Sequence, residues 1–226
     1  MVEYQRKDKY NFEDLCEIVS ILRSPGGCPW DIEQTHKSIR NDFIEEVYEA
    51  VEGIDNDDPS ILREELGDVL LQVVFHSDIC KTEGNFEMQD VITDLCNKLI
   101  VRHPHVFSQD DNYKNVDTPE KVLYNWNEIK KVTKGQKTKK EELSGVSRAL
   151  PSLFRGQKIA KKLRKSNDHY KCDNETLEKS LNEYENCKSK ESLGKLLFAL
   201  CASADTTDIN AEEALYGEIE EIINET

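Results

Sequence analysis

Apolar residues recur every three or four positions along almost the whole of this chain, and this spacing is the strongest constraint on its fold. The first such stripe consists of Leu15, Ile18, Val19 and Leu22. Residues three and four apart lie on one face of an α-helix, whereas a β-strand would require strict alternation. Because almost every later periodic segment has the same spacing, the sequence predicts an all-α protein.

Residues that start or stop helices separate these segments. Asn11 can cap the first helix with Asp14 three residues on, and the glycines and prolines of "SPGGCPW" at 24–30 force a loop. In that loop, Asp31 and Gln34 have the capping-box spacing that starts the next helix. The following helices are expected at about Thr35–Val51 with an end at Gly53, from Asp58-Pro59 onward, and at Phe86–Arg102.

Four helices with short connections describe an antiparallel bundle. The third is apolar almost all round at "VLLQVVF", residues 69–75, which indicates a central, buried helix. The fourth is expected to stop at "HPHVF", residues 103–107. Its expected inward positions are Val91, Leu95, Leu99 and Ile100.

Composition excludes several classes of function. The 226 residues suffice for one large domain or two small ones. With 45 acidic against 30 basic residues, the net charge of -15 repels nucleic-acid backbones, so we expect no direct nucleic-acid binding. The start "MVEYQRKDKYNFEDL" has no apolar signal-peptide core, and no segment approaches the roughly 18 apolar residues that cross a bilayer. These features predict a soluble, cytoplasmic protein without a membrane partner.

Cysteines and histidines give no metal-binding spacing. The seven cysteines are scattered and never form a Cys-x-x-Cys pair, which favours reduced thiols in a cytosol. They are Cys16, Cys28, Cys80, Cys96, Cys172, Cys187 and Cys201. His36, His76, His103 and His105 likewise have no spacing that demands a metal. No zinc site is indicated.

The chain divides after a further helix at about Pro119–Val132, which carries Trp126. Six lysines fall between Lys130 and Lys140 with no interleaved aromatic residue, a composition that favours a solvated linker over a nucleic-acid patch. We therefore predict a first domain at 1–132, a linker at 133–142 and a second domain at 143–226.

The second domain resembles the first. "LEKSLNEY" (177–184) can be aligned with "FIEEVYEA" (43–50), and "ESLGKLLFAL" (191–200) with "EELGDVLLQV" (64–73). On this alignment Glu45, Glu46, Glu65 and Asp68 correspond to Lys179, Ser180, Ser192 and Lys195, and only Glu49 keeps an acid, at Glu183. The second copy keeps the helical framework and loses the acids, which suggests a site abandoned in one of two repeats.

The acids of the first copy have the spacing of a metal site. Residues three apart on a helix project in similar directions, so Glu46 and Glu49 point together, as do Glu65 and Asp68. If the two helices pack side by side, four carboxylates converge and require protons or cations. Ordinary solvent-facing acids are the alternative for any single pair. A di-iron carboxylate bundle would need Glu-x-x-His, which these segments lack.

The ligand type indicates the cation and the class of substrate. Carboxylate oxygens alone favour Mg²⁺, with Mn²⁺ as a possible substitute, over zinc, copper or iron. Protein-bound magnesium usually shares its coordination with substrate phosphates, so a phosphate ester or anhydride is the expected substrate.

A family resemblance rests on these residues and their surroundings. "EEVYE" and "EELGD", with "LRSPGGCPWDIEQTHKSIR" before them and "DLCNKLIVRHPHVF" after them, resemble the MazG family of nucleoside triphosphate pyrophosphohydrolases. The resemblance runs through about residue 107, resumes at "VLYNWNEIKK" and "ELSGVSRALPSLFRGQKIAKKL", and fades after Ser166. It implies an all-α helical bundle of two repeats, a homodimer, and Mg²⁺-dependent hydrolysis of NTPs or dNTPs to nucleoside monophosphate and pyrophosphate.

The resemblance also assigns roles to residues. Glu46, Glu49, Glu65 and Asp68 match the family's metal ligands, and Glu45 is an adjacent acid that can orient or deprotonate the attacking water. Trp126 lies in the helix that matches the base-contacting segment, with core packing as the alternative. Two-repeat members can carry activity in the C-terminal copy, but here that copy has lost the ligands. Activity is therefore expected in the first repeat.

Further groups are candidates for substrate contacts. Lys98 and Arg102 lie four apart, can face the same way and have Asn97 beside them, so they can contact phosphates. The alternative is a pair of solvated bases at a helix end, where the helix dipole favours positive charge. Trp30 in the glycine-proline loop can cover the base instead of Trp126.

The expected role is removal of unwanted nucleotides from the pool. A different class of function is a non-catalytic helical dimer that binds nucleotides or a regulatory partner. The intact acids of the first repeat favour the enzyme.

Overall fold

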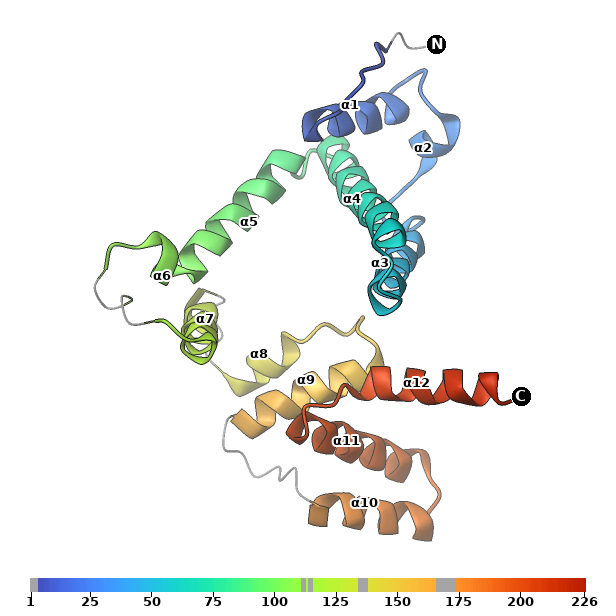
Figure 1. Ribbon diagram of the computed structural model, residues 1–226, viewed down its shortest axis with the longest axis vertical. Coiled ribbons are helices and arrows are strands. Elements are labelled where there is room, and N and C mark those ends of the chain that lie inside the picture. Colours follow the sequence, from blue (N-terminus) through green and yellow to red (C-terminus); the bar gives the residue numbers. More distant parts are fainter. Residues whose placement is uncertain (1–3, 111–112, 114–115, 134–137, 166–173) are drawn as a thin grey trace. The chain divides into compact units, whose positions relative to one another are not determined.

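The computed structural model describes residues 4–110, 113, 116–133, 138–165 and 174–226. Throughout these described residues the regular structure is helical, without a strand (Figure 1). The prediction of an all-α protein is therefore confirmed. Within the same ranges, no helix combines the length and apolar character that crossing a bilayer requires.

The chain forms two compact units, Met1–Ile129 and Lys130–Thr226. The helices up to the division are α1 (Phe12–Arg23), α2 (Pro29–Glu33), α3 (Arg40–Asp55), α4 (Pro59–Thr82), α5 (Met88–Arg102), α6 (Pro104–Phe107) and α7 (Pro119–Thr133). Those after it are α8 (Lys139–Ser144), α9 (Ser152–Lys165), α10 (Asn174–Asn186), α11 (Lys190–Thr206) and α12 (Ala211–Asn224). The division falls within α7, three residues before the predicted end of the first domain.

The predicted linker at 133–142 is only partly within the described residues. Residues 134–137 lie outside them. After this gap, Thr138 caps α8, because its hydroxyl accepts from the backbone N–H of Glu141 while the Glu141 carboxylate accepts from that of Thr138. A helix thus begins inside the predicted linker.

The core of the first unit lies where α1 crosses the C-terminal half of α4. Val19 of α1 packs with Val74, Phe75 and Ile79 of α4, together with Ile39 from the connection before α3. The predicted cap of α1 is confirmed, because Asn11 and Asp14 form a capping box. The central-helix interpretation of α4 holds for this half, which contains all six of its buried residues.

Arg23 of α1 contacts both α2 and α4. Its guanidinium forms a largely buried ion pair with Asp78 of α4 at 2.9 Å and donates to the carbonyl of Asp31 in α2 at 2.6 Å. It also lies over the ring of Phe75, 4.8 Å from the centroid. These contacts hold the glycine-proline loop and α2 against α4.

Helices α3 and α4 form a tight antiparallel hairpin (Figure 1). The predicted start of α4 is confirmed, because the Asp58 side chain accepts from the backbone N–H groups of Ser60 and Ile61 and Pro59 takes the first helical position. Gly53 does not end α3, which continues to Asp55. Instead, a Cβ atom at Gly53 would lie 2.8 Å from the backbone nitrogen of Leu62, so the missing side chain allows close packing.

The start of α3 differs from the prediction. The helix begins at Arg40 rather than about Thr35, with Ile39 at its N-cap. Asp31 and Gln34 do not form a capping box for it: Asp31 lies inside α2, and the Gln34 amide donates to the carbonyl of Trp30 at 2.8 Å. The capping prediction is therefore wrong, because the short helix α2 already includes the proposed capping residue.

Helix α5 diverges from α4 instead of completing a four-helix bundle with it (Figure 1). It has no buried residue, and its predicted inward positions Leu95, Leu99 and Ile100 are 46%, 39% and 48% exposed. The inward prediction is wrong for these three residues within the single chain. The predicted helix end is confirmed, since His103 caps the C-terminus of α5 and Pro104 begins α6.

The second unit repeats part of the first arrangement. Helices α10 and α11 form a hairpin as α3 and α4 do, and α9 packs on α11 as α1 packs on α4. The close approach of α9 and α11 depends on small residues, with Ala160, Ala199 and Ala202 buried. This arrangement agrees with the helical framework expected for a second repeat.

Candidate metal centre

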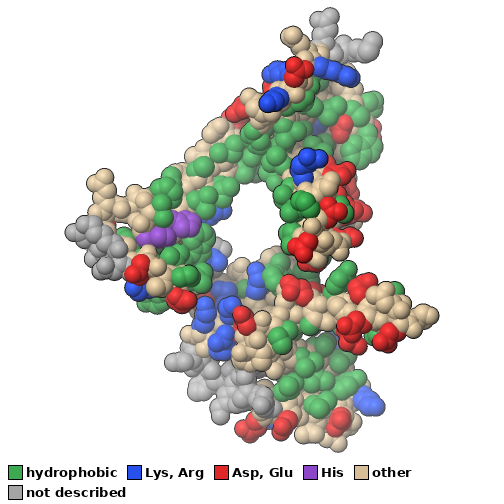
Figure 2. Space-filling view, viewed as in Figure 1, with side chains coloured by type: hydrophobic (Ala, Val, Ile, Leu, Met, Phe, Trp, Pro, Cys, Tyr) green, Lys and Arg blue, Asp and Glu red, His purple; other side chains and the backbone are tan. Residues whose placement is uncertain are grey.

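The α3–α4 hairpin brings the predicted acidic residues together. Glu46 and Glu49 lie on α3, and Glu65 and Asp68 lie on the N-terminal half of α4. Glu46, Glu49 and Glu65 each offer a carboxylate oxygen, and these three oxygens lie within 4.8 Å of one another. Acidic side chains gather over this hairpin in Figure 2. The spacing of three on each helix therefore produces a cluster across two helices.

The electrostatics of the cluster indicate uncompensated negative charge. Partial burial raises the pKa of Glu46, and the neighbouring charges of Asp68 and then Glu49 and Glu65 raise it further. Partial burial likewise raises the pKa of Glu65, helped by the charges of Glu49 and Asp68 and by a hydrogen bond with Glu49. Asp68 thus belongs to the same electrostatic group. Each carboxylate makes ionisation of its neighbours less favourable.

This donor set fits a hard divalent cation. All four side chains offer oxygen, Glu49 is exposed, and the other three are partly exposed, so water and a ligand can reach the group. A cation would remove the repulsion that raises the pKa values of Glu46 and Glu65. Oxygen ligands of this type suit Mg²⁺ or Mn²⁺.

Glu45 lies at the edge of the cluster. It is exposed on α3, and its charge is the smallest of those that raise the pKa of Glu46. Glu45 can therefore act on a water molecule beside the cluster without being one of its converging ligands.

The predicted phosphate-contacting residues lie on the diverging helix α5, not beside the acids (Figure 1). Asn97 and Lys98 are exposed. The guanidinium carbon of Arg102 lies over the ring of Trp126, 5.3 Å from the centroid. A single chain therefore does not gather the acidic and basic candidates at one point.

The two tryptophan candidates have different environments. Trp126 on α7 is half-buried between Arg102 and His103, whose ring centroid lies 4.8 Å away in an edge-on arrangement. Trp30 on α2 is 60% exposed. Trp126 already has side-chain partners, whereas the Trp30 ring is open to solvent.

The corresponding part of the α10–α11 hairpin has a different character. Lys195, which aligns with Asp68, forms an ion pair with Glu183, which aligns with Glu49. Ser180 and Ser192, which align with Glu46 and Glu65, are buried and donate to the carbonyls of Thr176 and Cys187 respectively. An exposed ammonium group paired with Glu183 and two small buried hydroxyls thus take the place of the acidic cluster, as the loss of acids from the sequence predicts.

A second group of possible metal ligands was missed by the sequence interpretation. His36, Cys80 and Glu83 also offer ligand atoms within 4.8 Å of one another. Cys80 and Glu83 are three apart at the end of α4, but His36 is 44 residues away from Cys80. The spacing of three between Cys80 and Glu83 is the only feature of the local sequence that indicates this group. His36 joins it only through the fold.

Comparisons with known proteins agree with this architecture. Residues 34–107, which contain the whole acidic cluster, match the MazG nucleotide pyrophosphohydrolase domain. A protein of Thermotoga maritima named nucleoside triphosphate pyrophosphohydrolase/pyrophosphatase MazG is 37% identical over 211 residues, 90% of this chain and 79% of that protein. The nucleoside triphosphate pyrophosphohydrolase of Escherichia coli K12 is 35% identical over 214 residues, 89% of this chain and 80% of that protein.

For a third relative, the aligned region is a smaller share of that protein's length. The uncharacterized protein YabN of Bacillus subtilis is 42% identical over 156 residues, 67% of this chain and 30% of that protein. Two relatives matched over about four fifths of their length, together with the domain match over the acidic hairpin, establish the family. This chain belongs to the MazG nucleotide pyrophosphohydrolase family.

Proposed function

We propose that this protein is a Mg²⁺-dependent nucleoside triphosphate pyrophosphohydrolase that acts through the acidic cluster of its α3–α4 hairpin. It is a hydrolase that converts an NTP or dNTP and water into the nucleoside monophosphate and pyrophosphate. The observation that carries the proposal is the convergence of Glu46, Glu49 and Glu65 from two helices, with Asp68 close enough to raise the pKa of Glu46 and Glu65.

The four carboxylates of the cluster have the role of metal ligands in this proposal. When bound, Mg²⁺ supplies positive charge to the phosphate oxygens and makes water a stronger acid, and Mn²⁺ can substitute for it. Glu45, at the edge of the cluster, orients the attacking water or accepts its proton. Repulsion among the carboxylates contributes to the raised pKa values of Glu46 and Glu65, and a bound cation would balance this negative charge.

Charged and aromatic residues elsewhere in the first unit are proposed to hold the nucleotide. Lys98 and Arg102, with Asn97 beside them, contact the phosphates and balance charge on the leaving pyrophosphate. Trp30 offers an exposed ring for the base. Trp126 positions Arg102 through the contact between its ring and the guanidinium, and remains the second candidate for the base.

A homodimer accounts for the apolar surface that a single chain leaves open. Helix α5 is amphipathic but buries none of its residues, and Leu95, Leu99 and Ile100 are exposed. Stripes of this kind normally pack against another element. We propose that a second copy of the chain covers them. Such a dimer also gives α5 of one copy a way to approach the acidic cluster of the other.

The biological role that fits this activity is nucleotide-pool house-cleaning in the cytoplasm. Hydrolysis to the monophosphate removes a nucleotide as a polymerase substrate. The enzyme's preference for base and sugar determines which nucleotide it removes. A substrate screen measures this preference.

The direct test is product analysis. Purified protein is incubated with a panel of NTPs and dNTPs, including dUTP, dCTP and phosphoribosyl-ATP, with Mg²⁺, and both pyrophosphate and monophosphate are measured. We expect equal amounts of the two products from at least one nucleotide. Absence of turnover with every nucleotide, or release of inorganic phosphate and a diphosphate, would contradict the proposal.

A metal-removal experiment tests the cofactor separately. A chelator is expected to reduce pyrophosphate release to the background rate, and excess Mg²⁺ or Mn²⁺ is expected to restore it. Full activity after exhaustive removal of divalent cations would exclude the magnesium requirement. It would not contradict the hydrolase activity itself, which the product analysis tests.

A further inference from the structure

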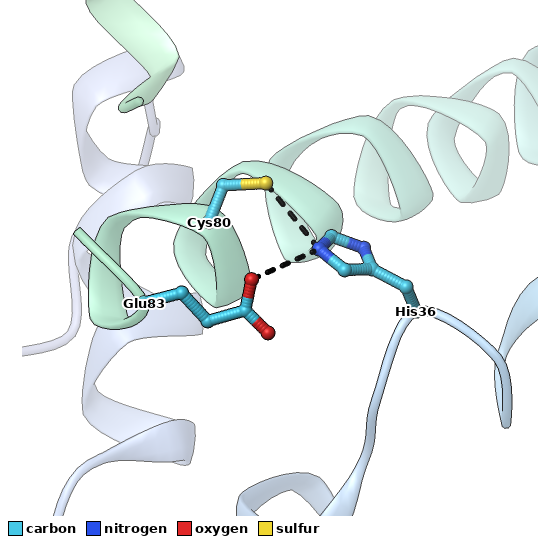
Figure 3. Close-up of side chains that lie close together, drawn as sticks. All are labelled: His36, Cys80 and Glu83. Atoms are coloured by element: carbon cyan, nitrogen blue, oxygen red, sulfur yellow. Dashed lines mark hydrogen bonds and ion pairs between the residues drawn. The ribbon is translucent and has the colours of Figure 1, made fainter. Parts of the chain in front are cut away.

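A group of side chains at the C-terminal end of α4 has the composition of a transition-metal site. The Sγ of Cys80 lies 3.3 Å from the Nε2 of His36, and the same nitrogen lies 3.9 Å from a carboxylate oxygen of Glu83 (Figure 3). All three residues turn their ligand atoms toward one another from two separate parts of the chain.

The fold fixes each member of this group independently. His36 lies in the connection between α2 and α3, where Ile39 is buried in the core and Thr35 and Ser38 are joined by hydrogen bonds. Cys80 is buried in the last turns of α4. Glu83 is the C-cap of that helix, and its backbone N–H donates to the carbonyl of Ile79 at 3.0 Å. The arrangement therefore does not depend on contacts among the three side chains alone.

A second histidine fixes the orientation of His36. The Nδ1 atoms of His36 and His76 are 2.8 Å apart, so one of them must donate and the other accept. When Nδ1 of His36 donates, Nδ1 of His76 accepts. With Nδ1 of His36 as the donor, its Nε2 lone pair faces Cys80 and Glu83. Metal-binding histidines commonly donate their other ring N–H in this way.

The distances are close to those of a tetrahedral zinc site. Bond lengths of about 2.0–2.3 Å at a tetrahedral angle place neighbouring ligand atoms roughly 3.3–3.7 Å apart. The Cys80–His36 distance of 3.3 Å already has this value. The Glu83 side chain is 53% exposed, so its carboxylate can move the small distance needed and a cation has a route from solvent.

We propose that His36, Cys80 and Glu83 form a second metal site, selective for a borderline cation such as Zn²⁺, with water at its fourth position. Thiolate and imidazole ligands select zinc over magnesium, in contrast to the all-oxygen cluster. The 12 residues from Asp68 to Cys80 correspond to about 18 Å along α4, so the two sites lie at different ends of one helix. The second site ties the α2–α3 connection to the end of α4.

Metal binding at this site exchanges a proton for the cation. Without metal, the Cys80 thiol can donate its proton to the Nε2 of His36 across the 3.3 Å contact. Formation of the metal–sulfur bond breaks the S–H bond and releases this proton to solvent, with no change of oxidation state.

Cobalt(II) titration of the full chain tests the proposal. Metal-free protein in a non-thiol reductant and excess Mg²⁺ is titrated with Co²⁺, which stands in for zinc and gives a near-ultraviolet absorption when bound by thiolate. We expect this absorption to saturate at one equivalent, to disappear in Cys80→Ala, and to be displaced by Zn²⁺. We also expect Zn²⁺ to raise the thermal midpoint of the wild-type protein and not that of Cys80→Ala.

Matched variants separate the three-ligand site from other thiols and from the acidic cluster. His36→Gln and the exposed variant Glu83→Gln are each expected to weaken Co²⁺ binding by about tenfold or more while helicity stays unchanged. Cys96→Ser, at an exposed thiol on α5, and Asp68→Asn are expected to leave the absorption intact. The proposal is overturned by absence of the thiolate absorption, by its survival in Cys80→Ala, by its loss in Cys96→Ser, or by unchanged affinity in both His36→Gln and Glu83→Gln.

Discussion

At the scale of single residues, the acidic cluster stores electrostatic repulsion that a cation can relieve. The pKa values of Glu46 and Glu65 are raised first by partial burial and then by neighbouring carboxylates. The unfolded chain has no such cluster, so its glutamates titrate near their ordinary value of 4.5. The cluster therefore makes the stability of the metal-free protein depend on pH in a definite direction.

The first prediction concerns Glu46→Gln in metal-free protein. An acid whose pKa is raised on folding stabilises the folded state below pH 4.5, and this contribution is lost as the pH rises through the raised pKa. Glutamine does not ionise, so the variant should gain free energy of unfolding relative to wild type as the pH rises from 4.5 to neutral. Denaturant unfolding at a series of pH values measures the difference.

The control is Glu52→Gln, an exposed position on the same helix. It is expected to show little change relative to wild type across the same pH range. A difference between Glu46→Gln and wild type that stays constant with pH would argue against the electrostatic account. Added Mg²⁺ should stabilise wild type more than Glu46→Gln, because binding to the folded state alone is stabilising.

At the scale of elements, the close approach of α3 and α4 determines whether the carboxylates converge. Gly53 is buried between the end of α3 and the start of α4, where an added Cβ would lie 2.8 Å from the backbone nitrogen of Leu62. We predict that Gly53→Ala forces the hairpin apart, destabilises the first unit by about 1–3 kcal/mol, and weakens divalent-cation binding. Thermal unfolding and metal titration of the same samples measure both effects.

Gly67→Ala provides the matched control on α4. No atom lies within 4 Å of the position of its added Cβ, and alanine favours helix by up to about 1 kcal/mol over glycine. The variant is therefore expected to raise the thermal midpoint. Equal destabilisation by both substitutions would show that the close approach at Gly53 is not the cause.

The helices and the acidic spacing could be predicted because both depend on local sequence. Each helix cap, at Asn11 or Asp58, involves only the first turn of its helix. The spacing of Glu46 and Glu49 likewise lies within one turn of α3. The spacing of Asp31 and Gln34 does not locate the start of α3, because Asp31 lies inside α2 and Gln34 is the C-cap of that short helix. The role of Gly53 was also missed, since a close approach to Leu62 leaves no local signal.

At the scale of the whole molecule, helical periodicity identifies an apolar stripe but not the surface that covers it. The spacing of the apolar residues of α5 predicts a stripe that faces its own bundle, yet Leu95 and Leu99 are exposed in the single chain. The spacing of apolar residues along α5 is the same whether the stripe packs against the same chain or against a second copy. For the same reason, the sequence predicts that Lys98 and Arg102 share one helix but not that this helix diverges from the acidic hairpin (Figure 1).

The proposed homodimer gives a further prediction. Placing a charge in the stripe with Leu99→Glu should convert a dimer into a monomer and reduce pyrophosphate release, because a buried unpaired charge is costly. Sedimentation measures the mass. Leu181→Glu, at a comparably exposed leucine of α10, is the control and should remain dimeric. A wild-type protein that is monomeric at assay concentration and fully active would contradict the proposal.

The central claim is that hydrolysis depends on the carboxylates of the α3–α4 hairpin and not on the aligned positions of the α10–α11 hairpin. The most direct measurement is Mg²⁺-dependent pyrophosphate release by Glu49→Gln, Asp68→Asn and Glu183→Gln, each checked for the helical content of wild type by circular dichroism. The first two should lose about 100-fold or more, because each removes charge that balances the cation. Glu183→Gln breaks only an exposed ion pair with Lys195 and should stay within about twofold of wild type. Full activity in both first-hairpin variants, or its loss in Glu183→Gln alone, would contradict the account.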